Sequence, residues 1–591
     1  MVGRARPGTY NIRMTELSHT NPKTAAEPLA LPLTREQFLW GALLVFTLAL
    51  RLGWLGWWPL TADEAGSALA AWRTLHGGSS GGAWSPLLVS LLRGLYGVFG
   101  ASDAPTRLPS AIAGSSLVLL AALWRRELGR AASLAAGVLL ALSPTLLLAS
   151  QRGDGAILGI ALVGWGITAL VRGVHDEHIT WQYIGAGLLG AALASAPNVI
   201  TWLAAGVVMA GLWLGRHPKA ERGALRSLGI LAIGKLLVVA LLAWLMSATA
   251  LLTNLAGLHQ AMALPWRWAT GIARLQPPWG WYGMARNLLV YELLILVPAA
   301  YGAAAAWRRD RWVRPVAAWA GLALLFGWLS RSYDPLAALD ALLPLTLLAA
   351  LGLSRLWDTL LQHTRALDVA LASPVIIFTT MGFFELIAYA RVPDDKLLLG
   401  AGVGFILAIL AWVGHWLWTE RAGALRNSVW LILLLLVCWT LRADSALLYQ
   451  TLDDPRESLG AGQVSRQVRA LPEFLAAHSS HTLGDAYVIH TAYDAALEPL
   501  AGWLLRDFTP QLAKIAAAPS TADALVRPAD DSGGGPAGYI GQRFVVWHRY
   551  TPRVLKFNEW LNWFLLREPI GEIEPTWLEV WVRVSEPPPA N

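Results

Sequence analysis

The sequence predicts a predominantly α-helical, polytopic membrane protein with a small α/β domain at its C-terminal end. Of its 591 residues, 55% are hydrophobic and only 14% are charged, and the mean hydropathy is +0.47. A soluble chain carries about 25% charged residues, and one globular core cannot conceal so large a deficit in a chain of this length. Apolar stretches of about 20 residues, each long enough to cross a bilayer, recur along most of the sequence.

Cysteine and charge content exclude two further classes of protein. The single cysteine, Cys438, rules out a disulfide scaffold. The net charge of +7 would suit nucleic acid only if the basic residues gathered on one soluble face. They lie between the apolar stretches instead, so we expect them to orient the protein in a membrane, with no nucleic-acid partner.

The N-terminal residues 1–35 are polar and lack the apolar stretch of a signal peptide, so they predict a cytoplasmic tail. Residues 36–446 follow as a transmembrane domain of about 13 helices. The predicted spans are 36–58, 106–127, 131–149, 155–171, 181–196, 198–214, 226–250, 286–306, 312–330, 335–356, 368–390, 397–418 and 427–446.

The basic residues fix the expected orientation of these spans. With the N-terminus inside, the cytoplasmic tail and turns hold 21 basic residues and the outer turns hold ten, as the positive-inside rule requires. Two outer loops are long, 59–105 and 251–285. Within the first, residues 85–100 are mostly apolar and predict a helix that lies along the interface.

An odd number of spans places residues 447–591 outside the membrane. This segment has ordinary polarity, with an amphipathic helical pattern near 457–477 and a Gly/Pro/Asp-rich break at 528–538. Alternating or apolar runs typical of strands occur at 486–491, 544–548 and 578–584. The pattern predicts a small extracytoplasmic α/β domain.

The first outer loop opens with an acidic pair, Asp63 and Glu64. Thr61 and Glu64 have the spacing of a capping box, which predicts a helix start and accounts for Glu64. Asp63 has only the weaker explanation of an acid near a helix N-terminus. Because the pair lies just outside the bilayer, however, either carboxylate is placed to meet a lipid-borne donor and a polar acceptor.

Glycosyl transfer from a lipid phosphate requires few protein groups. The phosphate is a stable anion that can leave without a general acid, so one carboxylate that deprotonates the acceptor hydroxyl suffices. Cations beside the leaving phosphate stabilise its developing charge.

A second polar cluster, 151–155, separates the third and fourth spans. It contains Arg152 and Asp154. In one interpretation the two residues form an ion pair within a tight turn. In the other, the Arg152 guanidinium binds a phosphate and Asp154 is a second carboxylate near Asp63. Both interpretations stay open. Arg331, in another short outer turn beside Asp334, is the second candidate cation for the donor phosphate.

Further candidates lie around the eighth span. Glu292 is an ionisable residue within an apolar run, and such residues are functional candidates by default. Trp279 and Tyr282, which precede it, suit a sugar-stacking wall, although an interfacial aromatic belt is the more common role. Motifs for nucleotide, dinucleotide or zinc binding are absent from the sequence. We therefore expect no cofactor, and leave a divalent metal ion open.

The order of several motifs resembles that of the GT-C membrane glycosyltransferases, a clan that includes protein O-mannosyltransferases and lipid A aminoarabinose transferases. The motifs are Arg51-Leu52, Asp63-Glu64, Ser85-Pro86-Leu87, Arg107-Leu108, Leu128-Gly129-Arg130, Leu142-Ser143-Pro144 and Arg152 with Asp154. The resemblance covers nearly the whole chain. It implies a polyprenyl-phosphate sugar donor, Asp63 as catalytic base, Glu64 in support and Asp154 in the same cavity.

A narrower resemblance is to the prokaryotic flippase activity-associated proteins. It rests on Pro278-Trp279 to Tyr282, Tyr291-Glu292, Asp454-Pro455-Arg456-Glu457 and Trp503 to Asp507. Two features depart from that family: Thr61-Ala62 stands where relatives often have His before the acidic pair, and 331–335 replaces a Lys-x-Pro-Trp segment.

Together these observations predict a cell-membrane glycosyltransferase that moves a sugar from a polyprenyl phosphate, with inversion, to an extracytoplasmic glycan, lipid or protein of the cell envelope. The main alternative is a non-catalytic partner or transporter in lipid-linked sugar export. The sequence shows no pair of related halves of the kind typical of transporters. A structural membrane scaffold is the third possibility, and it predicts no lipid-phosphate cavity.

Overall fold

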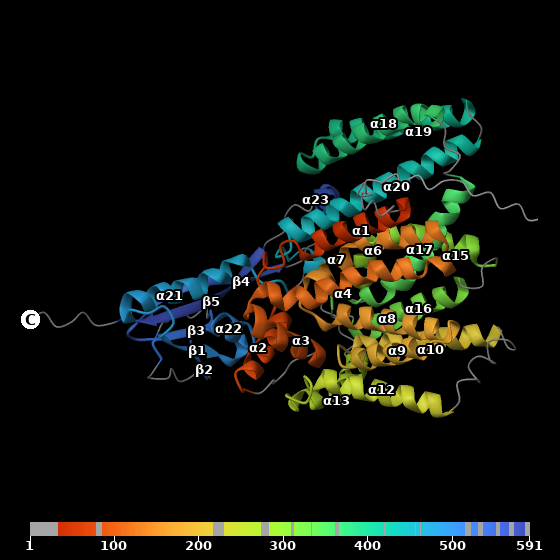
Figure 1. The fold of residues 1–591 in the computed structure, drawn as a ribbon. Coiled ribbons are helices and arrows are strands. Elements are labelled where there is room, and N and C mark those ends of the chain that lie inside the picture. Colours follow the sequence, from red (N-terminus) through yellow and green to blue (C-terminus); the bar gives the residue numbers. More distant parts are fainter. Residues whose placement is uncertain are drawn as a thin grey trace, which may run out of the picture.

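The computed structural model describes residues 34–584, apart from 79–84, 217–229, 274–282, 309–312, 332–333, 361–365, 419–420, 456, 461, 514–521, 530–535, 551–555 and 567–572. Almost all of the predicted N-terminal tail is therefore outside the described residues. A long helical bundle occupies one end of the molecule and a sheet domain occupies the other, with α2 and α3 between them (Figure 1).

The helices of the first 445 residues alternate with short turns. In chain order they are α1 (Arg35–Leu52), α2 (Ala62–Leu75), α3 (Pro86–Phe99), α4 (Asp103–Leu123), α5 (Arg125–Leu128), α6 (Arg130–Leu142), α7 (Pro144–Gln151), α8 (Gly155–His175), α9 (Ile179–Ala192), α10 (Asn198–Arg216), α12 (Ile230–Ala248), α13 (Ala256–Ala273), α14 (Gly283–Tyr291), α15 (Leu293–Ala306), α16 (Val313–Arg331), α17 (Leu339–Thr359), α18 (Ala366–Arg391), α19 (Asp395–Trp418) and α20 (Arg421–Ser445).

These helices make the chain a multi-pass membrane protein. Among the described residues, six helices are long and apolar enough to cross a bilayer alone, and two bent pairs, α6 with α7 and α14 with α15, raise the number to eight. Every predicted span overlaps a helix or a bent pair. The first span is shorter than the predicted 36–58, because α1 ends at Leu52 and residues 53–58 form turns and bends.

Buried charges hold the 57° bend between α6 and α7. The Arg51 guanidinium donates to the carbonyl oxygen of Leu140 in the last turn of α6 (2.8 Å). On the other side of the bend, Glu292 accepts from the Ser143 hydroxyl (2.8 Å) and from the Thr145 N–H (2.9 Å). A cation thus meets the carbonyl end of α6 and a carboxylate meets the N–H end of α7, as the helix dipoles favour.

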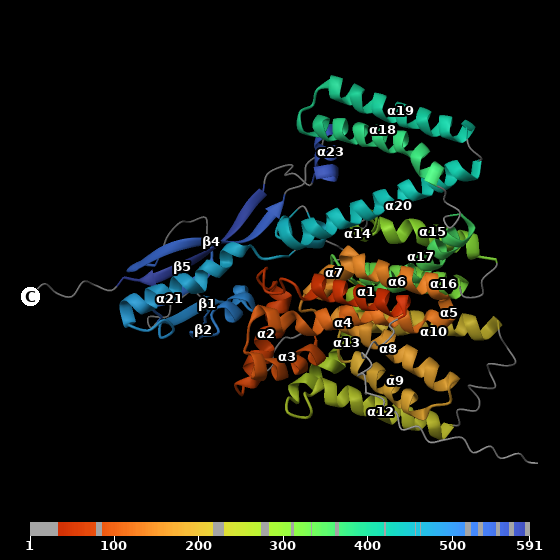
Figure 2. The same ribbon diagram turned by 45° about the horizontal axis from the view of Figure 1, so that its top comes forward.

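The helical hairpin of α18 and α19 stands apart from the rest of the bundle in both views (Figures 1 and 2). The two helices approach closely at Gly404 and Gly382, where a Cβ on Gly404 would lie 2.7 Å from the Gly382 nitrogen. Helix α23 (Phe557–Leu566) of the C-terminal segment packs against α18. The C-terminal segment therefore contacts the hairpin as well as the main bundle.

The C-terminal segment forms a five-stranded mixed sheet in the order β2-β1-β3-β5-β4. Its elements are the π-helical turn η2 (Ala446–Gln450), the 3-10 turns η3 (Ser458–Gly460), η4 (Arg466–Arg469) and η5 (Ala495–Leu497), the helices α21 (Ala470–Leu483) and α22 (Leu500–Leu504), and the strands β1 (His490–Asp494), β2 (Thr509–Ala513), β3 (Ala524–Pro528), β4 (Tyr539–Tyr550) and β5 (Ile573–Arg583). Strand β1 runs parallel to β2 and β3, whereas β5 is antiparallel to β3 and β4.

The sheet domain docks on α2 and α3 through a shared hydrophobic core, because buried side chains of both helices and of the sheet form one contiguous cluster. Two ion pairs flank this contact, Arg73 with Glu498 (2.6 Å) and Arg469 with Asp103 (2.8 Å). Both pairs are partly exposed, so the apolar contact contributes most of the docking energy.

Candidate functional site

The site begins where α2 starts, at the end of the bundle that faces the sheet domain. The Thr61 side chain accepts a hydrogen bond from the Glu64 N–H (3.3 Å), and the Glu64 carboxylate accepts one from the Thr61 N–H (2.8 Å). The capping box predicted from the spacing of these two residues is confirmed. It fixes the first turn of α2, which carries Asp63.

Glu64 is also half of a buried ion pair with Arg107 of α4. The guanidinium meets both carboxylate oxygens, at 2.7 and 2.9 Å, and the Gly153 N–H donates to the same carboxylate (2.6 Å). Arg107 also donates to the carbonyl oxygens of Trp58 (2.8 Å) and Pro59 (3.0 Å). This pair therefore joins the start of α2 to α4 and to the turn after α7.

Every oxygen of Glu64 is thus committed to a structural contact. Burial alone would raise the pKa of Glu64, but the charge and hydrogen bonds of Arg107 outweigh it, helped by the backbone N–H groups of Thr61 and Gly153. The net pKa of Glu64 is lower than that of an ordinary glutamate. A carboxylate with a lowered pKa and no available oxygen is a poor proton acceptor.

Asp63 has the opposite environment. Its side chain is exposed, yet the protein around it desolvates the carboxylate and raises its pKa. The negative charge of Asp334 raises the pKa of Asp63 further, and the positive charge of Arg152 lowers it. Asp63 is therefore an accessible carboxylate whose raised pKa suits a general base.

Arg152 is buried at the C-terminal end of α7, with 9% of its surface exposed. Its Nη2 donates to the carbonyl oxygen of Leu459 (2.9 Å). Its Nε is buried and has no hydrogen-bond partner among the described residues. Burial lowers the pKa of Arg152, and the carboxylates of Glu64, Asp334 and Asp154 act against that shift. The guanidinium stays charged and keeps one donor available.

Asp154 lies at the N-terminus of α8, half-buried in the same cluster. Its carboxylate accepts from the Ala156 N–H (3.1 Å), which caps the helix, and its carbonyl oxygen accepts from the Ser110 hydroxyl of α4 (3.0 Å). The next residue, Gly155, has no space for a side chain, because a Cβ would lie 2.3 Å from the Ser85 hydroxyl oxygen. The start of α8 is therefore joined to α4 through Asp154 and packs closely against the start of α3 through Gly155.

The segment that leads into the sheet domain crosses this cluster. Glu457 accepts a hydrogen bond from the Tyr291 hydroxyl, Leu459 binds Arg152, and Gln463 donates to the Pro59 carbonyl oxygen (2.8 Å). Residues 457–463, which we call the strap, thus bridge the bundle and the loop before α2. The described positions of the strap are buried except Gly462.

Other candidates do not join the cluster or lie outside the description. Glu292 is buried at the 95° break between α14 and α15, and its Oε1 accepts from the start of α7, so it holds a helix end. Trp279 and Tyr282 lie outside the described residues, as does the side chain of Arg331. Their predicted substrate contacts stay predictions.

Two residues of the cluster had less obvious sequence signals. In the sequence Arg107 is marked only as part of a motif. Its pairing with Glu64 is seen only in the folded chain. In the sequence Asp334 is marked only as the neighbour of Arg331, but in the folded chain its charge acts on Asp63 and Arg152. Within the described part of the chain, no group of three or more His, Cys, Asp or Glu side chains is arranged to hold a metal ion.

Comparison with known proteins gives a partial match to a family model and a similar fold. The family model described as dolichyl-phosphate-mannose-protein mannosyltransferase matches residues 84–246. No curated protein sequence matches the chain. The fold is similar to that of ArnT from Cupriavidus metallidurans bound to undecaprenyl phosphate, with a TM-score of 0.50 and 15% identity over 83% of this chain and 93% of that one.

Two further structures are similar. The apo state of the same ArnT gives a TM-score of 0.50 at 13% identity, over 84% of this chain and 93% of that one. An Archaeoglobus fulgidus oligosaccharyltransferase gives 0.43 at 12% identity, over 80% of this chain and 63% of that one. The resemblance to flippase activity-associated proteins stays a prediction. The family model matches only part of the chain, and the ArnT structures show that the chain has a GT-C-like fold.

Proposed function

We propose that this protein transfers a sugar from a polyprenyl phosphate to an acceptor hydroxyl on the extracytoplasmic face of the membrane. The observation that carries the proposal is an exposed Asp63 carboxylate within the electrostatic influence of the buried Arg152 guanidinium, whose Nε keeps a donor available. The family match and the ArnT-like fold support a glycosyltransferase in general terms.

The proposed reaction is a single displacement at the anomeric carbon. Asp63 accepts the proton of the acceptor hydroxyl as its oxygen forms the new bond to that carbon. The bond to the phosphate oxygen breaks, and its electron pair stays with the phosphate, beside Arg152. One displacement inverts the anomeric configuration. Asp154 and Glu64 keep the cluster in place through α8 and α2.

The proposed orientation follows from the distribution of basic residues. We propose a cytoplasmic tail at 1–35, a transmembrane domain at 36–446 and an extracytoplasmic domain at 447–591. In that orientation the cluster lies at the outer end of the bundle, where the loops 59–105 and 251–285 also lie. The acceptor is a glycan, lipid or protein that reaches this face.

One observation favours the alternative of a non-catalytic partner or transporter in lipid-linked sugar export. The two bent helix pairs, α6 with α7 and α14 with α15, resemble the discontinuous helices that form binding sites in transporters. The two proposals differ in product. Purified protein incubated with polyprenyl-phosphate sugars and candidate acceptors should release polyprenyl phosphate and form an inverted glycoside; lipid binding without any product would favour the alternative.

A further inference from the structure

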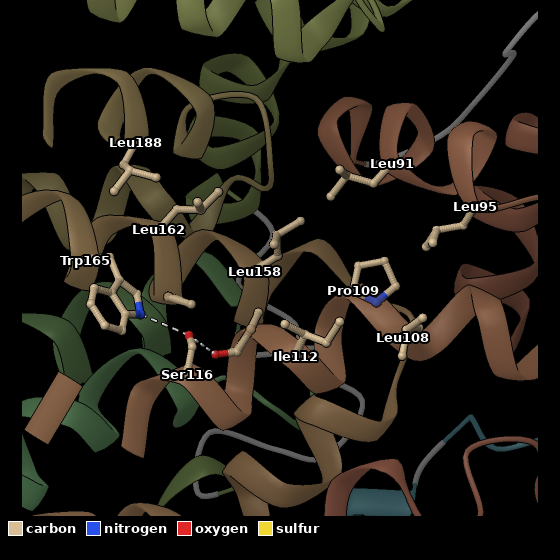
Figure 3. A pocket seen from close by; sticks show the side chains of 12 residues that line it. Leu91, Leu95, Leu108, Pro109, Ile112, Ser116, Leu158, Leu162, Trp165 and Leu188 are labelled. Atoms are coloured by element: carbon tan, nitrogen blue, oxygen red, sulfur yellow. Dashed lines mark hydrogen bonds between the residues drawn. The ribbon is translucent and has the colours of Figure 1, made fainter. Parts of the chain in front are cut away.

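Exposed apolar side chains are expected on helices that cross a membrane, because lipid tails surround them there. Ile112 of α4, a candidate span, is 54% exposed at the apolar cavity between α3, α4, α8 and α9 (Figure 3). Similar side chains occur on α23, which follows the last candidate span in the chain: Phe557 is 60% exposed and Trp560 is 43% exposed. An aqueous environment would leave both of these aromatic rings in water.

Helix α23 contacts two candidate spans, α18 and α20. It packs against α18, and the centre of its Phe564 ring lies 4.9 Å from that of Trp439 on α20. Trp439 comes six residues before α20 ends at Ser445, which is about 9 Å along the helix axis. Helix α23 therefore reaches past the end of α20, to a level at which the spans on either side of it are themselves surrounded by lipid.

Three aromatic side chains form a row along one face of α23. Phe557, Trp560 and Phe564 are three and four positions apart, the spacing of neighbours on a helix surface. The ring centres are 6.5 Å apart between Phe557 and Trp560, and 5.1 Å apart between Trp560 and Phe564. Asn558 and Asn562, one turn apart, mark the opposite and polar face. Helix α23 thus has the two faces of a helix that lies in a membrane interface.

The long strands β4 and β5 link α23 to the sheet domain. They pair along their whole length as far as Tyr550 and Ile573, and α23 lies between these two residues in the chain. The far ends of both strands point toward α23 (Figure 2). The position of α23 is therefore coupled to that of the sheet.

We propose that α23 lies in the membrane interface on the side of the sheet domain, with Phe557 and Trp560 in contact with lipid. In this position α23 anchors the sheet domain to the bilayer. It also links the hairpin of α18 and α19 to α20, through the packing on α18 and the contact between Phe564 and Trp439. Trp is the aromatic residue that interfaces favour, because its ring is apolar and its N–H is polar.

The test is site-directed spin labelling of the full chain in nanodiscs. Cys438→Ser removes the one native cysteine, and Trp560→Cys then takes a nitroxide label. Oxygen concentrates in lipid and a nickel chelate in water, so the ratio of their effects on spin relaxation reports which of the two surrounds the label. We expect this ratio to be about tenfold higher for Trp560→Cys than for an exposed position of the sheet, as fits a side chain about 5–10 Å below the headgroups.

Two labelled positions serve as references. Ile540→Cys on β4 is the aqueous reference, because Ile540 is 65% exposed on the sheet. Ile406→Cys is the lipid reference, because Ile406 is 57% exposed in the middle of the candidate span α19. Phe557→Cys tests the same face of α23 if Trp560→Cys does not fold. The proposal is overturned if the labels on α23 favour the nickel chelate as Ile540→Cys does. It is also overturned if they are shielded from both reagents, since protein would then cover this face.

This inference and the proposed function can fail separately. Labels on α23 that favour oxygen, in a protein that transfers no sugar from any donor, support the membrane position of α23 and contradict the enzyme. Sugar transfer by a protein whose α23 labels favour the nickel chelate supports the enzyme and contradicts the membrane position.

Discussion

Arg107 and Glu64 form a bidentate ion pair whose side chains are only 4% and 2% exposed, at 2.7 and 2.9 Å. Removing one partner of such a pair leaves a buried charge without compensation. Glu64 belongs to the acidic pair from which a catalytic role was predicted, but its contacts are those of a structural anchor. The contacts of Glu64 are structural, and we propose the catalytic role for the adjacent Asp63.

We expect Arg107→Gln to destabilise the folded protein by about 3–5 kcal/mol, because Glu64 stays buried without its partner. Thermal unfolding in detergent should show a large fall in Tm. The double variant Arg107→Gln with Glu64→Gln should lose less than the sum of the single variants, since they act on one contact. Additive losses would mean that the two side chains are not energetically coupled.

Asp63→Asn should reduce sugar transfer by about 10²- to 10⁴-fold, the usual loss when a general base is removed. The asparagine side chain has a similar shape, and Asp63 is exposed, so the Tm should stay close to that of wild type. The measurement is release of polyprenyl phosphate under single-turnover conditions. Asp176→Asn, an exposed acid after α8, is the matched control. Wild-type turnover by Asp63→Asn would remove this residue from the mechanism.

The rate of transfer should rise with pH through a pKa above that of an ordinary aspartate, because desolvation and then the charge of Asp334 raise the pKa of Asp63. Asp334→Asn removes that second contribution, so the rise in rate should move to lower pH. A pH profile of kcat/KM for both proteins tests the shift. An unchanged profile would mean that Asp334 does not act on the base.

The same shift has a defined sign in stability. A carboxyl group whose folded pKa is raised stabilises the fold fully below its unfolded pKa and loses that contribution as the pH rises through the folded pKa. Asp63→Asn should therefore keep or raise the Tm at neutral pH. Glu64, with a lowered pKa, stabilises the fold above its unfolded pKa and loses that contribution as the pH falls through the folded value.

Arg152→Gln should weaken binding of undecaprenyl phosphate more than it lowers the Tm, because it removes the charge that we assign to the phosphate. Arg152→Lys keeps a charge but not the planar fork that reaches Leu459, so it should recover part of the affinity. Titration of the lipid into each variant, with its Tm measured in parallel, separates the two effects. Equal relative losses in both would indicate a purely structural arginine.

A reporter that is active only in the cytoplasm should stay silent when it is fused after Asn591. The expectation follows from the bias of 21 basic residues on one side against ten on the other. A fusion after Arg216 should be active, because that turn is predicted to be cytoplasmic. Activity of the C-terminal fusion would show that the predicted orientation is reversed or that the predicted number of spans is wrong by one.

Local signals explain what the sequence could predict. The spans follow from hydropathy, which each segment carries in itself, and the capping box follows from two residues three positions apart. The helix expected near 457–477 was partly wrong, since 458–460 and 466–469 form 3-10 turns and α21 begins at Ala470. Before α21, Leu459 is buried in the core of the bundle, and Val464 and Val468 are buried in the core that α2 and α3 share with the sheet domain.

Contacts between residues far apart in the chain explain what the sequence could not predict. Asp334 lies far along the chain from Asp63, and no pattern in either neighbourhood indicates that their charges interact. Nor does the sequence indicate that Arg152 donates to the Leu459 carbonyl oxygen, because every residue has a backbone carbonyl. Glu292 is a further example: this buried acid in an apolar run binds the N-terminal end of another helix, a contact that its sequence neighbourhood does not indicate.

The strap has a consequence for biosynthesis. The hydrogen bond between Arg152 and Leu459 joins residues 307 positions apart, so a growing chain that has already inserted its first spans still lacks a partner for that guanidinium. The cluster is completed only after the last membrane helix has been inserted and the strap has been delivered to the same face. Nascent and C-terminally truncated chains should accordingly be inert toward lipid phosphates, and activity should appear abruptly with chain length rather than in proportion to it.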